Sequence, residues 1–246
     1  MNKPKISIAM TCYNQGHFIS DAIKSIVNQT IDKWELNIVD DKSTDNSLEE
    51  IKKLIRKFNI ENKVNIIQHQ KNKGYGPSLH DAIMAANAPL VGIIDSDDAL
   101  SRTSVFERCI NAHNENQNVV LTYSNYIECD KKLNQKSIFK TRQLEKHESY
   151  MTAGVRVSHF KVLKKEAYLK TDGINPKLRQ TVDKDLVLKL EETGDFLHID
   201  KSLYFYRHHS NNLSRSIHKK SRQYRKFVSK MRTQIYEDAK QRRGIK

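Results

Sequence analysis

The sequence lacks the features that mark several large classes of protein. Its three cysteines, Cys12, Cys109 and Cys129, show no C-x-x-C spacing and indicate neither a disulfide framework nor a zinc site. No apolar run approaches the roughly 18–20 residues that span a bilayer. The apolar stretch that follows Met1 is too short for a signal peptide and is typical of a first strand. We therefore expect a cytoplasmic protein.

Acidic residues are fewer than basic ones. The chain has 43 Lys and Arg against 29 Asp and Glu, so its formal net charge is +14, and much of the excess follows residue 214. Such a balance favours a polyanionic partner, which is nucleic acid, anionic lipid, or a phosphorylated or carboxylated substrate. A non-catalytic basic nucleic-acid-binding protein is one interpretation, but no recognised nucleic-acid-binding motif supports it, and we consider nucleic acid an unlikely partner.

Strand and helix patterns alternate through the first hundred residues. Short apolar runs predict strands at 6–11, 34–39, 64–68 and 90–94. Apolar side chains at helical spacing predict helices over 19–27, 47–58 and 77–86, the last with Pro77 in its first turn. This alternation predicts βαβ units and an α/β fold, with a Rossmann-like, mainly parallel central sheet flanked by helices.

The second half is less regular. The patterns predict a helix over 103–116, a strand over 119–123, a mobile polar loop over 130–150, an extended stretch over 155–163 and a helix over 183–190. Two short strands are expected at 196–199 and 203–206. A last amphipathic helix is expected from Ser221. Because it is rich in lysine and arginine, it suits an anionic membrane surface, docking on its own domain, or a second subunit.

Three of the first four predicted strands end in polar clusters, which are Tyr13-Asn14, Asp40-Asp41 and Asp95-Ser96-Asp97-Asp98. The carboxyl ends of parallel strands share one edge of a sheet, so we expect the clusters to lie together. Crowded carboxylates repel one another unless a cation compensates, and Mg²⁺ and Mn²⁺ prefer oxygen ligands and bridge diphosphates. The alternative for Asp98 is a cap on the helix over 103–116, and for Asp40-Asp41 a turn.

These segments, with Asn72-Lys73-Gly74, resemble the family 2 glycosyltransferases of the GT-A fold. The resemblance implies that Tyr13 and Asp41 contact the nucleotide base, with Lys73 nearby. It also implies that Asp95 faces the ribose and the donor sugar, and that Asp97 holds the metal. Asn14 and Ser96 are expected to belong to the same nucleotide and sugar site.

The resemblance extends into the second half. The stretch 181–190 looks like the family's acidic motif, in which the usual Glu-Asp pair is here Val182-Asp183. Asp183 therefore takes the position of the catalytic base, with Asp185 as second choice, although either could instead cap the helix. In the stretch 204–214 the histidine that completes metal binding corresponds to His209, and a histidine-rich surface loop is the alternative.

The stretch 158–163, which contains His159, looks closest to catalytic domains of bacterial hyaluronan and chondroitin polymerases. His159 and Arg207 are further candidates for the site. The resemblance implies a GT-A domain over 1–216, with a nucleotide-binding half (1–100) and an acceptor half (101–216), and a C-terminal helix over 217–246.

The activity implied is inverting, Mn²⁺- or Mg²⁺-dependent transfer from a nucleotide-diphosphate sugar, with UDP favoured, to a saccharide or lipid-linked acceptor in surface polysaccharide synthesis. Such a protein would act in the cytoplasm, with peripheral contact to the inner face of the membrane. A sugar nucleotidyltransferase of related fold is the nearest catalytic alternative. It is disfavoured because no glycine-rich basic loop follows the first predicted strand.

Overall fold

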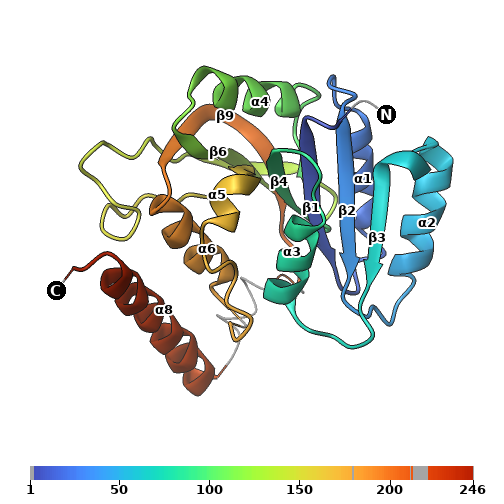
Figure 1. Cartoon of the computed structure of the whole chain (residues 1–246). Helices are drawn as coiled ribbons and strands as arrows, with labels where there is room; N and C mark the ends of the chain where they lie inside the picture. Colours follow the sequence, from blue (N-terminus) through green and yellow to red (C-terminus); the bar gives the residue numbers. More distant parts are fainter. Residues whose placement is uncertain (1–2, 179, 211, 213–220, 246) are drawn as a thin grey trace.

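A computed structural model describes residues 3–178, 180–210, 212 and 221–245. Within them nine strands form one sheet in the order β3-β2-β1-β4-β8-β6-β9-β5, with β7 paired to β6 (Figure 1). The first four strands are β1 (Ile6–Cys12), β2 (Trp34–Asp40), β3 (Val64–Gln68) and β4 (Leu90–Asp95). They are followed by β5 (Ala99–Leu100), β6 (Val119–Cys129), β7 (Gln135–Phe139), β8 (Lys161–Lys164) and β9 (Asp195–Arg207).

Helices flank both faces of the sheet. The helices of the first half are α1 (Ile19–Val27), α2 (Ser47–Phe58) and α3 (Tyr75–Met84). Those of the second half are α4 (Val105–Glu115), α5 (Lys165–Leu169), α6 (Val182–Glu191) and α8 (Arg222–Arg242). β1 pairs in parallel with β2 and β4, and β2 with β3, so the first half is the expected Rossmann-like sheet. The second half is mixed, because β8 runs antiparallel to both β4 and β6 whereas β9 runs parallel to β6.

Several sequence predictions for the second half were wrong in detail. The region 130–150 is not all loop, because β7 pairs with the end of β6 there. Its exposed side chains gave no apolar signal. The two short strands expected at 196–199 and 203–206 are one long strand, β9, whose register shifts where it passes residues 124–126 of β6. Of the extended stretch over 155–163, only its last residues belong to β8.

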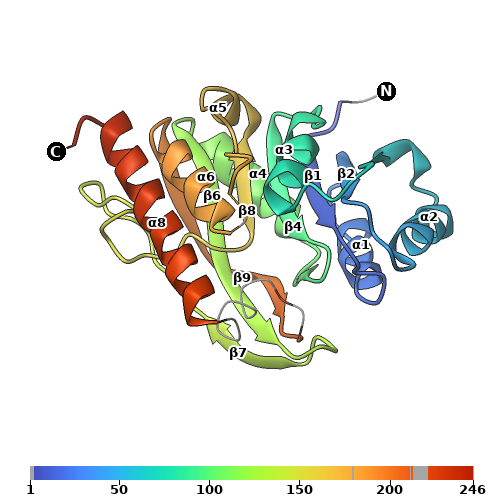
Figure 2. The same cartoon turned by 90° about the horizontal axis from the view of Figure 1, so that it is seen from below.

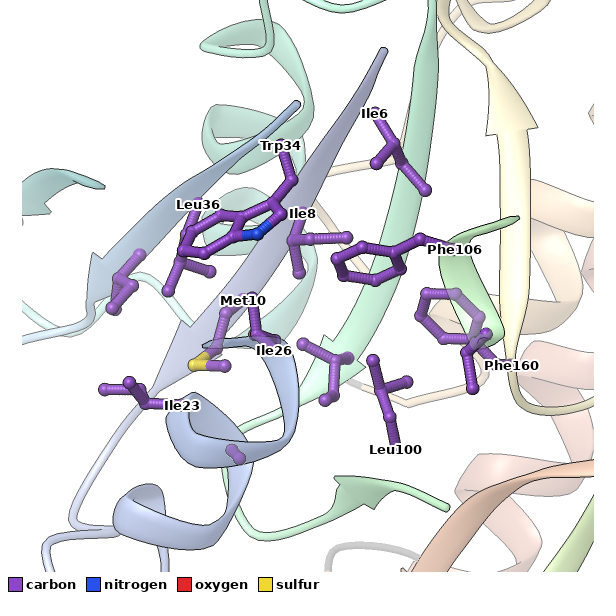
Figure 3. Packing of buried hydrophobic residues seen from close by; sticks show 14 of the residues in the cluster. Ile6, Ile8, Met10, Ile23, Ile26, Trp34, Leu36, Leu100, Phe106 and Phe160 are labelled. Carbon is purple, nitrogen blue, oxygen red and sulfur yellow. The ribbon is translucent and has the colours of Figure 1, made fainter. Parts of the chain in front are cut away.

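Two apolar clusters lie on the two faces of the sheet. The first packs α1, α2 and α4 onto one face, and Figure 3 shows Ile23 and Ile26 of α1 directed toward Met10 and Leu36. The second joins α3, α5, α6 and α8 on the other face. Both clusters are built from side chains at helical or alternating spacing, as binary patterning requires. The strand ends between the two layers remain available for a site.

Gly92 in β4 is required by close packing. A Cβ at this position would lie 2.6 Å from Cζ of Phe160, and Phe160 is buried beside β4. The missing side chain lets the chain enter β8 directly against β4, where Gly92 pairs with Val162 and Ile93 with Lys161. This packing places Lys161, at the start of β8, next to the end of β4.

The C-terminal helix α8 docks on the protein's own domain. It runs beside α6 in both views (Figures 1 and 2), and Val228, Ile235 and Ala239 are buried. The expected boundary between residues 216 and 217 lies outside the described residues, as do the basic residues over 213–220. Among the described helices, none combines the length and apolar character that crossing a membrane would need.

Candidate active site

A cavity of about 750 Å³ opens at the carboxyl ends of β1, β2 and β4. Because β1 lies between β2 and β4 in parallel, the chain segments that follow these strands meet at one edge. The first turn of α6 closes the cavity from the second half of the chain. Of the residues predicted from sequence, those in its wall are Tyr13, Asn14, Asp41, Asp95, Ser96, Asp97, Asp98, His159 and Asp183.

Asp41 organises the loop that follows β3. Its Oδ1 accepts a hydrogen bond from the backbone N–H of Lys73 (2.8 Å), and its Oδ2 accepts one from Gly74 (2.7 Å). Its side chain is buried, and Nδ1 of His69 lies 2.7 Å from Oδ1. Gly74 has a φ of +92°, a conformation that favours glycine. Asp41 therefore holds this loop at the wall of the cavity.

His69 and Lys73 extend this arrangement to α3. The second ring nitrogen of His69 lies 2.8 Å from Oδ2 of Asp81, and Nζ of Lys73 donates to the same oxygen at 3.0 Å. These contacts hold the pKa of Asp81 below its usual value, although burial alone would raise it. The Lys73 side chain is thus engaged with α3 beside the cavity and is not part of its wall.

Asn14 joins the segments that follow β1 and β2. It has a φ of +55°, in the left-handed region that asparagine tolerates. Its Oδ1 accepts a hydrogen bond from the backbone N–H of Thr44 at 2.7 Å, and its own N–H donates to Ser43 at 3.1 Å. Tyr13, its neighbour in the cavity wall, is 47% exposed, so its ring is accessible to a ligand.

The acidic turn after β4 concentrates negative charge. Burial and the nearby charge of Asp97 raise the pKa of Asp95 to about 7, with the Lys161 ammonium partly offsetting them. Burial, followed by the charges of Asp97 and Asp95, raises the pKa of Asp98 well above its usual range. Tyr75 Oη also donates to Asp95 Oδ1 at 3.3 Å. Such a cluster binds a cation favourably, because a positive charge relieves the mutual repulsion.

Asp98 is not the helix cap that was considered from sequence. α4 begins at Val105 with Ser104 at its N-cap, and Oδ1 of Asp98 instead accepts a hydrogen bond from the backbone N–H of Arg207 at 2.7 Å. The Arg207 side chain is buried and is not part of the cavity wall. It donates to the Asp97 carbonyl (2.5 Å), to Asp21 of α1 (2.7 Å) and to the Lys131 carbonyl (2.6 Å). Arg207 thus braces the acidic turn.

His209 lies beside Asp97, the residue to which the resemblance assigns the metal. Its Nε2 is 2.8 Å from Oδ2 of Asp97, and its ring packs 4.6 Å from that of Phe18. Asn212 Nδ2 donates to the same Asp97 oxygen at 3.4 Å. No group of three His, Cys, Asp or Glu arranged for a metal occurs within the described residues. Mg²⁺-type sites commonly use one or two carboxylates together with substrate phosphates, so the Asp97 carboxylate fits such an ion, with the His209 nitrogen beside it.

The two candidate bases occupy different environments. Asp183, in the first turn of α6, is exposed in the cavity wall, where its charge contributes to the raised pKa of Asp95. Asp185 is buried outside that wall, and its Oδ2 accepts a hydrogen bond from Lys189 at 3.0 Å. Thr181, just before α6, has a φ of +62°, which is unusual for a β-branched residue. Only Asp183 of the two aspartates can meet a ligand in the cavity.

Sequence reasoning missed several residues of the cavity wall, among them Tyr75, Lys161, Arg232 and Asn212. Lys161 is 4% exposed and lies within the stretch 158–163 that was singled out for His159. Burial, and then the charge of Lys161, holds the pKa of His159 well below its usual value, so this imidazole is neutral. Arg232 comes from α8, and no local pattern could relate it to strands more than a hundred residues earlier.

The comparisons with known proteins agree with this arrangement. The sequence model for glycosyl transferase family 2 matches residues 7–171. Chondroitin synthase of Escherichia coli is 31% identical over 211 residues, which are 86% of this chain and 30% of that protein. Hyaluronan synthase of Pasteurella multocida is 30% identical over 214 residues, which are 86% of this chain and 21% of that protein. The chain thus spans less than a third of the length of these relatives.

Solved structures show the same fold. S. aureus TarS 1–349 in complex with UDP-GlcNAc superposes with a TM-score of 0.73 at 18% identity, over 86% of this chain and 61% of that one. The mannosyltransferase PcManGT of Pyrobaculum calidifontis, in complex with GDP-Man and Mn²⁺, gives a TM-score of 0.65 at 12% identity, over 88% of this chain and 61% of that one. The expected GT-A fold is confirmed, and the chain belongs to glycosyl transferase family 2.

Proposed function

We propose that the protein is an inverting transferase that moves a sugar from a nucleotide-diphosphate sugar, with UDP as the nucleotide, to a saccharide or lipid-linked saccharide of a surface polysaccharide. The main support for this proposal is the position of Asp183, which lines the cavity from α6. The acidic turn after β4 lines the same cavity from the sheet. A base on one side and a charge-stabilising group on the other is what a single displacement needs. The polysaccharide synthases among the relatives support the substrate class.

The donor would lie along the strand ends. We assign Tyr13, Asn14 and Asp41 to the base side, where Asp41 fixes the Lys73–Gly74 backbone. Asp95 and Ser96 are assigned to the ribose and the donor sugar. The UDP-GlcNAc complex of TarS is consistent with a uridine nucleotide.

Asp97 and His209 would hold Mn²⁺ or Mg²⁺, which when bound offsets negative charge on the diphosphate. The raised pKa of Asp95 and of Asp98 fits this assignment, because burial and then the neighbouring carboxylates disfavour the charged forms, which a bound cation would stabilise. Asp183 would accept the proton of the acceptor hydroxyl as its oxygen attacks the anomeric carbon. Tyr75 would orient Asp95 through its hydrogen bond.

Location and domain division remain predictions. Action in the cytoplasm rests on three cysteines that are all free and buried. A nucleotide-binding half (1–100), an acceptor half (101–216) and a C-terminal helix (217–246) remain our division of the chain. The docking of α8 on α6 favours an attached helix over one that extends to a membrane or a second subunit.

The experiment is a nucleotide-release assay over UDP-, GDP- and dTDP-sugars with Mn²⁺, with and without saccharide acceptors. The UDP-sugars should be the productive donors. Asp183→Asn should lower turnover by at least about 100-fold, because general-base catalysis contributes about 10²–10⁴-fold, while UDP affinity stays unchanged. Asp172→Asn, at an exposed aspartate outside the cavity wall, is the matched control and should keep full turnover. Wild-type turnover in Asp183→Asn would remove Asp183 as the base.

A further inference from the structure

The two halves of α8 differ in how their charges are used. In the C-terminal half, Arg242 and Arg243 form ion pairs with Glu192 at 2.9 and 3.2 Å. Arg243 also pairs with Glu191 at 2.8 Å. Ile235 and Ala239 are buried against the domain. These contacts fix the helix in place.

In the N-terminal half, the cations form no ion pair with any other described residue. Between residues 222 and 232 the helix has five cations and no carboxylate, and these are Arg222, Arg225, Lys226, Lys230 and Arg232. All five are exposed, and none of their side chains has an ion pair or hydrogen bond with another residue in the part of the chain that the structure describes. A docked helix with unneutralised charge presents a fixed positive surface.

This surface leads into the cavity. Arg232, at its C-terminal end, lines the same cavity as Asp183 and the neighbouring Gln180 and Thr181. Figure 2 shows α8 running along α6, whose first turn contains Asp183. Of the five cations, Arg232 is thus the one in the cavity wall, which it shares with the proposed catalytic base, and the other four precede it along the same helix.

The apolar residues of α8 distinguish between two anionic partners. A helix that lies in a membrane surface buries a broad apolar face in the lipid. Val228, Ile235 and Ala239 already face the protein, and Phe227 is the one large apolar side chain of the helix that is strongly exposed, at 50%. What α8 presents outward is charge, which suits an anionic chain in water better than the interior of a bilayer.

We infer that the N-terminal half of α8 binds an acceptor that is an anionic saccharide chain, with Arg232 contacting the sugar unit nearest the cavity. The guanidinium groups would bind carboxylate or phosphate oxygens of the acceptor, which they do with paired hydrogen bonds. This inference rests on the proposed function, because it makes the α8 side of the cavity the acceptor side.

The test compares two variants of equal charge change. Arg225→Glu/Lys226→Glu/Arg232→Glu alters the surface described above. Lys52→Glu/Arg56→Glu/Lys57→Glu reverses three exposed cations of α2, outside the cavity wall. The probes are hexagalacturonate, its neutral methyl ester, pentamannose phosphate with neutral pentamannose, and vesicles of phosphatidylcholine with or without phosphatidylglycerol. Binding is measured by calorimetry and flotation at low and at physiological salt.

We expect wild type to bind an anionic probe more tightly than its neutral counterpart by at least about tenfold at low salt, because the surface charges are unscreened there. The α8 variant should lose this preference and the α2 variant should keep it. Tighter binding of hexagalacturonate would indicate a carboxylated acceptor, and tighter binding of pentamannose phosphate would indicate a phosphorylated one. The inference is overturned if wild type binds each anionic probe no more tightly than its neutral counterpart, or if the α8 and α2 variants lose the same amount of binding. It is also overturned if the α8 variant loses binding to vesicles but not to the saccharides. UDP binding is measured in parallel, and its absence in wild type would refute the proposed function.

Discussion

The two sides of the cavity hold their polar groups in different ways. On the side of β1, β2 and β4, the carboxylates and amides accept hydrogen bonds from the protein itself, as Asp41 does from the Lys73 and Gly74 backbone and Asp98 does from Arg207. On the side of α6 and α8, Asp183 and Arg232 are exposed and form no such contact with other described residues. The proposed donor side is therefore held by internal hydrogen bonds, and the proposed acceptor side keeps its groups available for a substrate.

Removing the brace of the donor side should have the largest effect on stability. Arg207→Met deletes a buried guanidinium and leaves the Asp97 and Lys131 carbonyls without their donor. We expect the free energy of unfolding to fall by about 4 kcal/mol, the usual cost of breaking a buried charged network. Chemical denaturation measures it. Arg156→Met, at an exposed arginine of the second half, should cost less than about 1 kcal/mol. Similar losses in both variants would mean that Arg207 is not a brace.

The second-largest effect is expected in the pH dependence of stability, which tests the acidic turn on the side of β1, β2 and β4. In metal-free protein the pKa of Asp95 is about 7, above the value of about 4 in an unfolded chain. Asp95 therefore holds its proton more tightly in the folded state than in the unfolded chain. This difference adds to the free energy of unfolding, fully below about pH 4, and the added stability is lost as the pH rises through 7. Between about pH 5 and pH 7 it should amount to about 2 kcal/mol.

The measurement is denaturation in the presence of a chelator across this range. Asp95→Asn cannot titrate, so its free energy of unfolding should fall by about 2 kcal/mol less than that of wild type between about pH 5 and pH 7. Asp32→Asn, at a distant aspartate, should leave the wild-type slope unchanged. Parallel curves for wild type and Asp95→Asn would show that Asp95 is ionised throughout.

The smallest effect is expected where α8 meets α6. Lys184 Nζ donates to Tyr236 Oη at 2.5 Å and lies 4.7 Å from the centre of the same ring. Tyr236→Phe removes the hydrogen bond and keeps the ring, so we expect a loss of about 1 kcal/mol. Tyr224→Phe removes a hydroxyl that makes no hydrogen bond with another described residue, and it should be neutral. If Tyr236→Phe had no effect, α8 would be held by its apolar contacts and arginines alone.

The first half of the fold could be predicted because its signals are local. The apolar runs of β1, β2, β3 and β4 end within about one residue of where the patterns placed them, and the polar residues at their ends meet as the rule for parallel sheets requires. β7 was missed because its side chains are exposed, so its pairing with β6 left no apolar alternation.

Only those residues of the site that belong to short sequence motifs could be predicted. Asp97 with His209, and Asp183, were placed by resemblance, whereas periodicity alone gave no reason to bring them together. Arg207 was expected near the ligand, but its four side-chain and backbone contacts are internal, because a buried guanidinium must satisfy its donors within the protein. Lys161 and Arg232 depend on tertiary placement in β8 and α8, which no local pattern encodes.

The docking of α8 through its C-terminal half has a consequence for changing specificity. Arg242 and Arg243 form ion pairs with Glu191 and Glu192 at the C-terminal end of the helix, far from the cations at its start. The outward residues between 222 and 232 can therefore be replaced without touching the anchor or the strand ends. If the start of α8 binds the acceptor as proposed, this separation would let the choice of acceptor change, in evolution or by engineering, while the proposed donor site stays as it is.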